Sequence, residues 1–171
     1  MKKTARRIFG FVLVFAALVM FAFAASAAAL ERIEGTVRAS NCPTGDIALM
    51  GDTVLIMDKD ITLRSISGNY NLTVQNQGGH VLKITMPLDE NVITANPSGH
   101  GISVKSFTSD ANLDITARKD GLNIDQAINI TGGNVKINCG GDAIYSRNSS
   151  ITVSGATLNL TAKQGFIVSK E

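Results

Sequence analysis

Tryptophan is absent from this sequence, proline occurs three times and cysteine only twice. The two cysteines, Cys42 and Cys139, do not form a C-x-x-C pair, so the sequence offers no cysteine-based metal site. In an oxidising compartment they either form one disulfide or remain two separate small residues. The sequence leaves both alternatives open, because a disulfide requires Cα atoms within about 7 Å of each other.

Charge of one sign does not dominate the chain either. All 14 acidic residues lie beyond residue 29, together with 12 of the 16 lysines and arginines, which leaves a net charge of −2 in that part. Charges of both signs are dispersed, and the basic stripe that typically binds nucleic acid is missing. We therefore expect no nucleic-acid partner.

A basic and then apolar segment opens the chain. Four basic residues precede an uninterrupted apolar run from Ile8 to Ala25, and A-x-A sequences end at Ala27 and Ala29. This layout is typical of a secretory signal peptide. We expect residues 1–29 to be cleaved and the mature chain to be secreted or periplasmic, with no membrane contact. The alternative is an uncleaved anchor, because the run approaches the length that spans a bilayer.

A sustained helical period is missing beyond residue 29, and short alternating runs take its place. Almost all of them have three residues in the order apolar, polar, apolar. The runs include residues 53–56, 61–63, 72–74, 82–84, 102–104, 113–115, 122–124, 128–130, 135–137, 151–153 and 158–160. Such strands are too short for a β-sandwich, whose strands usually have about five or six residues.

The runs recur with a nearly fixed step. Similar segments open, one after another, at Gly101, Gly121, Ala143 and Gly165. A period near 22 with three short strands is typical of a solenoid. The prediction is an all-β, single-stranded parallel β-helix of about five to six coils over residues 51–171. Residues 30–50 are expected to form an N-terminal cap or first coil.

Toward the N-terminus the period loosens. Leu82 precedes Ile102 by about one period, which places the two in equivalent positions, and the longer segment from Val54 to Leu82 is expected to carry a bulged loop. Only the segment from Thr85 to Asn96 is long enough to overhang a face of the helix.

Stacking is what gives such short strands a core. One coil cannot bury its apolar face alone, so each coil pairs with its neighbours. Ile102, Leu122 and Ile144 are expected in one interior file. Alternation along the strands predicts outward positions for Ser103, Asn123, Asp114 and Lys136.

The C-terminal end of the helix needs protection, because open sheet edges promote pairing with other chains. The sequence shows no amphipathic capping helix before Lys170 and Glu171. Two alternatives remain: charge alone protects this edge, or another subunit stacks on it in an end-to-end self-association.

A recurring phrase occupies two coils between Lys119 and Ala162. It runs G-D-G/A-I, then I-x-I-x-G-G, and appears as KDGL at residues 119–122, INITGG at 128–133 and GDAI at 141–144. This stretch resembles the bacterial carbohydrate-binding-domain family of extracellular parallel β-helices, whose architecture is related to that of pectate lyases. The resemblance implies a right-handed helix that binds acidic polysaccharide with the aid of calcium.

Aromatic residues, on which sugar rings usually stack, are scarce. Tyr145 is the one aromatic residue at a clearly outward strand position, and Phe107 is expected in a turn. Tyr145, Asn123 and Arg147 are therefore the candidate ligand-binding residues.

The column before the first strand of each coil is the candidate metal site. It contains His100, Asp120, Asp142 and Gln164. Stacked coils would place the two carboxylates about 4.8 Å apart, where they repel each other unless a cation lies between them. Calcium held by Asp120 and Asp142 is one interpretation. The alternative is that the carboxylates accept hydrogen bonds from corner amides.

Catalytic residues are not indicated. Two carboxylates at the separation required for glycoside hydrolysis arise on any two neighbouring coils, so the pattern is unspecific. The two histidines, His80 and His100, are expected to be turn residues. The sequence favours an exported, non-catalytic module that binds anionic polysaccharide, with calcium as a candidate cofactor. The alternatives are a structural, self-associating β-helix and a degenerate polysaccharide lyase.

Overall fold

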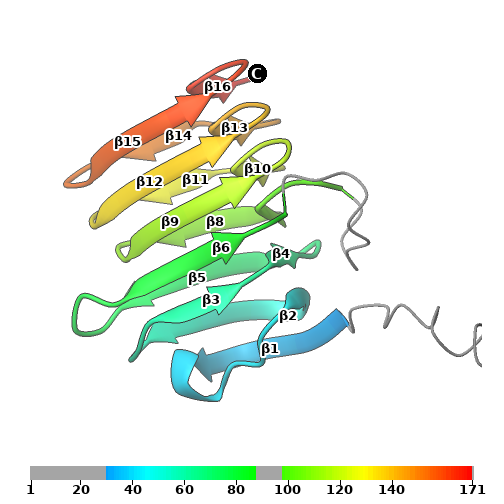
Figure 1. Ribbon diagram of the computed structural model, residues 1–171, viewed down its shortest axis with the longest axis vertical. Helices are drawn as coiled ribbons and strands as arrows, with labels where there is room; N and C mark the ends of the chain where they lie inside the picture. The colour runs from blue at the N-terminus through cyan, green and yellow to red at the C-terminus, as the bar shows by residue number, and fades with distance from the viewer. Residues whose placement is uncertain (1–29, 88–97, 171) are drawn as a thin grey trace, which may run out of the picture.

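The computed structural model describes residues 30–87 and 98–170, and the predicted signal peptide lies outside them. Strands dominate this part of the chain, and one 3₁₀ helix, η1 (Ala39–Asn41), accompanies them. Within the described ranges, no helix is long and apolar enough to span a membrane. The strands stack as about six turns of a parallel β-solenoid, which confirms the predicted fold class (Figure 1).

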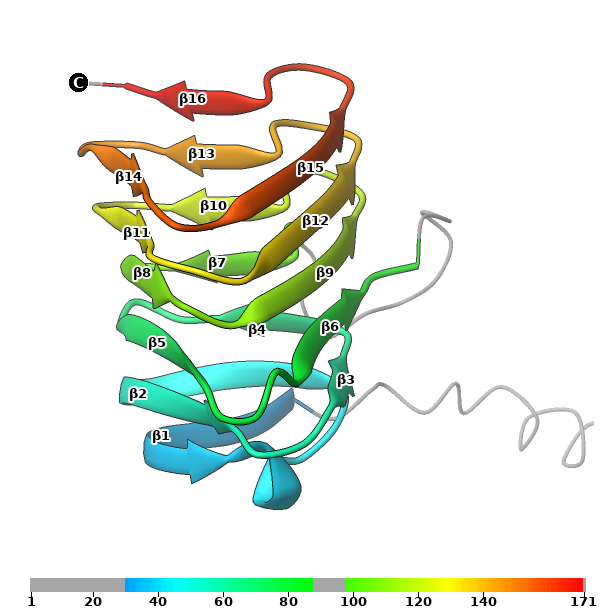
Figure 2. The ribbon, with the colours of Figure 1, turned by 90° about the vertical axis from the view of Figure 1, so that its left-hand side faces the viewer.

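The strands are arranged on three faces of the solenoid (Figure 2). The first face contains, in spatial order, β4 (Ser65–Ser67), β7 (Ile102–Val104), β10 (Leu122–Ile124), β13 (Ile144–Ser146) and β16 (Ile167–Ser169). The second face contains β5 (Asn71–Asn76), β8 (Ser106–Ser109), β11 (Ile128–Ile130) and β14 (Ile151–Val153). The third face contains β3 (Ile61–Leu63), β6 (Val81–Thr85), β9 (Asn112–Ala117), β12 (Asn134–Cys139) and β15 (Thr157–Ala162).

Two longer strands run through the corner between the first and second faces. In β2 (Asp46–Met57), residues 46–48 pair with β4 and residues 53–57 pair with β5. The strand β1 (Leu30–Arg38) lies below β2 and pairs with it in parallel over both faces. Throughout the described ranges the strands pair in parallel, because each strand meets its equivalent one coil away.

The core is a set of files in which apolar side chains of successive coils stack directly. Leu122 pairs with Ile102 on one side and with Ile144 on the other, and all three are fully buried. This confirms the predicted interior file. Burial of each such side chain contributes about 1.5–3 kcal/mol, which is how three-residue strands become stable.

Close stacking also fixes the small residues beside this file. A Cβ atom on Gly101 would lie 2.8 Å from the carbonyl oxygen of Gly121 in the next coil, and one on Gly121 would lie 2.7 Å from the carbonyl oxygen of Ala143. Larger side chains at these positions would push neighbouring coils apart.

The position of the long insertion differs from the prediction. Leu82 pairs with Leu113 on the third face and not with Ile102, whose partner in the preceding coil is Ile66. Val54 pairs with Thr73 at an ordinary short step, so the segment before Leu82 carries no extra loop. The insertion lies between β6 and β7, and residues 88–97 of it are outside the described ranges.

Two further register predictions need correction. Ile167 and not Phe166 pairs with Ile144, because the last corner is longer by a single position than the one before it. In the corner column, the residue of the last coil that lies next to Asp142 is therefore Gly165 and not Gln164. Phe107, expected in a turn, lies in β8 and is fully buried.

The two cysteines are free and buried in separate parts of the solenoid. Burial raises the pKa of the Cys42 thiol to about 11, although nearby Lys59 partly opposes this effect. Burial likewise raises the pKa of Cys139. Both thiols are therefore protonated at neutral pH and behave as small apolar core residues.

Candidate functional site

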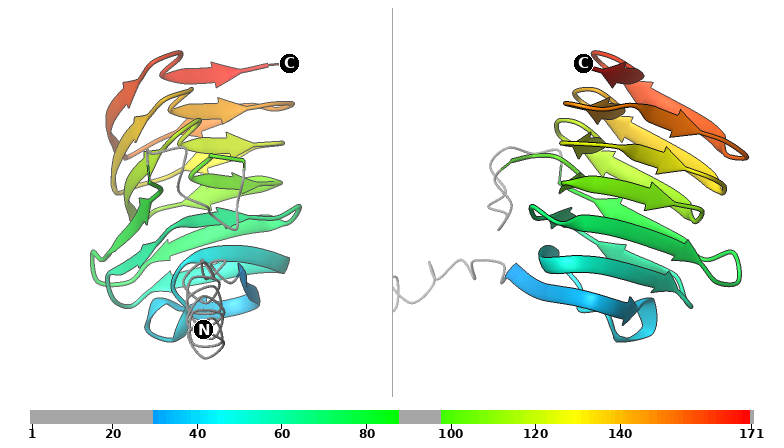
Figure 3. Two further views of the ribbon diagram at one scale, coloured as in Figure 1. Left: turned by 45° about the vertical axis from the view of Figure 1, so that its right-hand side comes forward. Right: turned by 180° about the vertical axis from the view of Figure 1, so that it is seen from behind.

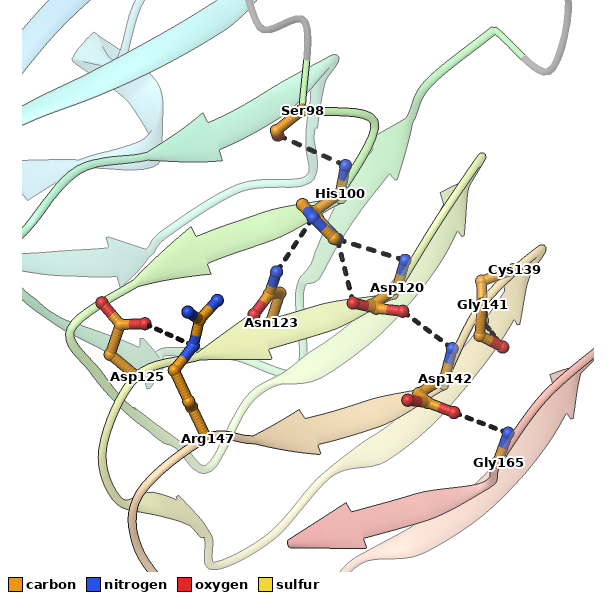
Figure 4. Close-up of polar contacts among 10 residues, drawn as sticks. All are labelled: Ser98, His100, Asp120, Asn123, Asp125, Cys139, Gly141, Asp142, Arg147 and Gly165. Atoms are coloured by element: carbon orange, nitrogen blue, oxygen red, sulfur yellow. Dashed lines mark hydrogen bonds and ion pairs between the residues drawn. The ribbon is translucent and has the colours of Figure 1, made fainter. Parts of the chain in front are cut away.

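The corner column leads into the first face and is formed by the residues two positions before the first residue of β7, β10 and β13. His100, Asp120 and Asp142 occupy equivalent positions of three consecutive coils (Figure 4). The structure thus brings these three residues together in the order that the sequence spacing predicts. Asn123 lies beside them on β10.

The two carboxylates of the column bind backbone amides of the following coil. Asp120 Oδ1 accepts a hydrogen bond from the Asp142 N–H (2.8 Å), and Asp142 Oδ1 accepts one from the Gly165 N–H (2.6 Å). Similar bonds to an adjacent coil occur at other corners, between Asp52 and Asn71 (2.9 Å), Asp60 and Val81 (2.9 Å), and Asp110 and Asn76 (2.6 Å). Carboxylates thus satisfy corner amides along much of the solenoid.

His100 connects the column to the middle of the first face. Its Nδ1 lies 3.1 Å from Asp120 Oδ2, and its Nε2 lies 2.9 Å from Asn123 Nδ2. With a proton on Nδ1 the ring donates to the carboxylate while Nε2 accepts from the Asn123 amide, whereas an Nδ1 without a proton accepts from the Asp120 backbone N–H, 3.3 Å away. His100 therefore covers Asn123, and this residue is only 9% exposed although its side chain is directed outward.

Asp120 is held in its charged form. Partial burial raises its pKa, but hydrogen bonds from His100 and from the Asp142 amide outweigh burial, and the pKa lies below the usual value for aspartate. At neutral pH this carboxyl therefore carries no proton to donate, which argues against a role as general acid.

The lowered pKa predicts how stability depends on pH. Since the unfolded Asp120 binds a proton more readily than the folded one, its contribution is complete above pH about 4 and is lost as pH falls through the folded pKa. We expect Asp120→Asn to be less stable than wild type at pH 7 and to lose less stability between pH 5 and 2. Urea unfolding midpoints measured across this range test the prediction, and parallel pH profiles of the two proteins would contradict it.

Calcium at Asp120 and Asp142 stays a prediction. Within the described ranges, no group of three or more histidine, cysteine, aspartate or glutamate side chains converges as a metal site. Both carboxylate oxygens of Asp120 already have partners in His100 and the Asp142 amide. Calcium requires six to eight oxygen ligands, so most of them would have to come from backbone carbonyls, a bound ligand or water.

A second group of side chains lies on the outer side of the first face. Tyr145 is the neighbour of Asn123 on the paired strand, and Arg147 follows two residues later, exposed to solvent. Arg147 Nε lies 3.4 Å from Asp125 Oδ1, and the Lys170 Nζ lies 5.7 Å from the centre of the Tyr145 ring. Of the three predicted ligand-binding residues, Tyr145 thus contacts Lys170, Arg147 pairs with Asp125, and Asn123 contacts His100.

Lys170 was not among the predicted ligand-binding residues. The amides of Asp125, Arg147 and Lys170 each bind a carbonyl oxygen of the preceding first-face strand, so these residues form one column just beyond the strands. The signal was present in the sequence, because the steps between the three residues are close to the period, but the longer last corner obscured it.

Comparison with known proteins finds no match for this chain among family models, curated proteins or solved structures. The parallel β-solenoid is therefore established by the geometry of the chain alone, and the resemblance to carbohydrate-binding domains stays a prediction.

Proposed function

We propose that the protein is an exported, non-catalytic module that binds anionic polysaccharide on the outer side of the first face. One observation carries the proposal: the Lys170 Nζ lies 5.7 Å from the centre of the Tyr145 ring, and the exposed Arg147 occupies the same column as Lys170 on the neighbouring coil. An aromatic ring near a column of cations suits a ligand that presents both sugar rings and carboxylates.

The chemistry of each group supports this ligand class. A guanidinium binds a carboxylate through two parallel hydrogen bonds, and Arg147 is more than half exposed even though it pairs with Asp125. Lys170 over the Tyr145 ring is a cation–π pair that leaves its ammonium available to an anion. Exposed charge pairs contribute little individually, so we propose modest, salt-sensitive affinity.

The test is calorimetric titration of the full chain with polygalacturonate. We expect heat of binding for wild type, a roughly threefold to fivefold weaker affinity for Arg147→Ala, and an approximately tenfold weaker affinity for Tyr145→Ala. Lys136→Ala is the matched control, because Lys136 is an exposed cation on the third face. Equal effects of Lys136→Ala and Arg147→Ala, or no heat with wild type, would contradict the proposal.

The role of calcium is tested by repeating the same titration with added calcium and with excess chelator. If calcium assists binding, as the resemblance implies, excess chelator will weaken the wild-type affinity and Asp142→Asn will remove the difference. If affinity is the same with calcium and with chelator, the face binds the polysaccharide without the ion. An assay for unsaturated sugar products on the same samples tests the alternative of a lyase.

A further inference from the structure

Charged side chains of both signs follow the first-face strands. The residues directly after β7, β10, β13 and β16 are Lys105, Asp125, Arg147 and Lys170, and the pairing of these strands places them on four consecutive coils. The Gln126 amide binds the Lys105 carbonyl oxygen, so Lys105 stands in the column already described for the other three. The first-face strands are stacked along the length of the solenoid (Figure 3), and this charged column runs in the same direction.

Asp125 interrupts the cations of the charged column. Its Oδ1 lies 3.4 Å from Arg147 Nε, and the exposed fractions of the two side chains are 52% and 57%, so a ligand can reach both. On the other side, Lys105 occupies the same position one coil away, at a strand spacing of about 4.8 Å. A ligand that lies along the charged column therefore meets, coil by coil, a cation, a carboxylate and two further cations.

Lys105 has a second acidic neighbour. Hydrogen bonds from Asn71 lower the pKa of Asp52, which is therefore charged at neutral pH, and Lys105 lies within electrostatic range of it. Asp52 belongs to β2, whereas Asp125 follows β10, so the two carboxylates lie on opposite sides of Lys105 along the solenoid. The alternation of charge thus continues toward the N-terminal coils.

The two kinds of group suit different parts of a polysaccharide. Lysine and arginine bind carboxylates. An aspartate repels a nearby carboxylate but accepts hydrogen bonds from the hydroxyl groups of an uncharged sugar. One sugar of an extended chain is about as long as the strand spacing, so successive sugars can face successive coils.

We propose that the first face selects a polysaccharide in which acidic and uncharged sugars alternate, and that Asp125 determines this selectivity. The inference rests on the proposed function, because it assigns the sugar pattern of the same ligand. The polysaccharide lies along the charged column, with acidic sugars at Lys105 and Arg147 and an uncharged sugar between them at Asp125. A chain with a carboxylate on every sugar loses affinity at Asp125.

Calorimetric titration of the full chain with two oligosaccharides of equal length tests the proposal. Hyaluronan alternates glucuronate with an uncharged amino sugar, whereas oligogalacturonate carries a carboxylate on every sugar. We expect wild type to bind the hyaluronan oligosaccharide more tightly. Asp125→Asn is expected to strengthen the binding of oligogalacturonate roughly threefold more than that of hyaluronan. The release of Arg147 from its partner strengthens both and cancels in the ratio of the two changes.

Asp114→Asn is the matched control, because Asp114 lies outward on the third face and its replacement changes the net charge by the same amount. It is expected to leave the ratio of the two affinities unchanged. Lys105→Ala is expected to weaken the binding of hyaluronan about threefold, as Arg147→Ala does, since both cations face acidic sugars. Circular dichroism establishes that all variants are folded.

Three results would overturn the selectivity and leave the polysaccharide function in place. The first is tighter binding of oligogalacturonate by wild type. The second is an equal ratio of affinities in Asp125→Asn and Asp114→Asn. The third is a loss of hyaluronan affinity for Arg147→Ala without one for Lys105→Ala, because the ligand would then not follow the charged column. No heat with either oligosaccharide would overturn both the selectivity and the proposed function.

Discussion

Replacing Phe107 with alanine is expected to lower the free energy of unfolding by about 3–5 kcal/mol. Phe107 is fully buried in β8 and stacks between Leu72 and Ile128 of the adjacent coils. The neighbouring strands hold their register through hydrogen bonds and cannot close the resulting cavity. A loss of this size is a large share of the roughly 5–15 kcal/mol that stabilises an ordinary domain.

Chemical denaturation of wild type and variant measures this loss. Tyr70→Ala is the control, because Tyr70 is an aromatic residue that is 39% exposed, and we expect it to cost about 1 kcal/mol or less. If the two substitutions destabilise the protein equally, Phe107 does not occupy a packed interior file.

Gly133→Ala is the second substitution with a large expected effect, at about 3 kcal/mol. Gly133 has a φ of +78°, in the left-handed region that an alanine adopts only at a cost of about 1–2 kcal/mol. A Cβ atom there would also overlap the carbonyl oxygen of Ala111 in the preceding coil. Backbone atoms in a parallel ladder cannot move away without breaking hydrogen bonds, so steric repulsion adds to the conformational cost.

A matched glycine separates the two contributions. Gly79 has nearly the same φ, +80°, but a Cβ atom there would meet no heavy atom within 4 Å. Gly79→Ala is therefore expected to cost only the conformational part, about 1–2 kcal/mol. Equal losses for Gly79→Ala and Gly133→Ala, measured by the same denaturation, would show that the close approach of the coils has no energetic weight.

The solenoid itself was predictable from the sequence because its local and global patterns agree. From Ile102 onward, most of the short strands repeat apolar, polar and apolar residues, and the nearly constant step between coils returns the same residue types to the same positions. Other arrangements leave such three-residue strands without a buried face, so the period indicates parallel stacking.

The register of particular residues was less predictable. The step of about one period assigns Leu82 to the file of Ile102, and the alternation of a strand does not reveal which face it belongs to. Its true partner is Leu113. The insertion before β7 separates the first-face strands β4 and β7 by an unusual step, which the period could not reveal. The last corner is likewise longer by a single position than the period predicts, so Ile167 and not Phe166 pairs with Ile144.

The candidate site was only partly accessible from the sequence. The column of His100, Asp120 and Asp142 follows from the period, and the structure places all three in it. The coverage of Asn123 by His100 depends on how one corner folds over the sheet. The position of Lys170 over Tyr145 depends on side-chain conformation, which residue spacing does not specify.

The nearly uniform step between β7 and β15 makes each lap of the chain an interchangeable module. Removing residues 122–143 would join Gly121 to Ile144 and bring Ile144 directly onto Ile102, the contact that Leu122 makes in the intact chain. Proteins of this architecture can therefore change length in whole laps while both termini keep their own surroundings. Other increments are accommodated at the corners, as the insertion between β6 and β7 and the longer last corner show, because the strands that follow keep their files.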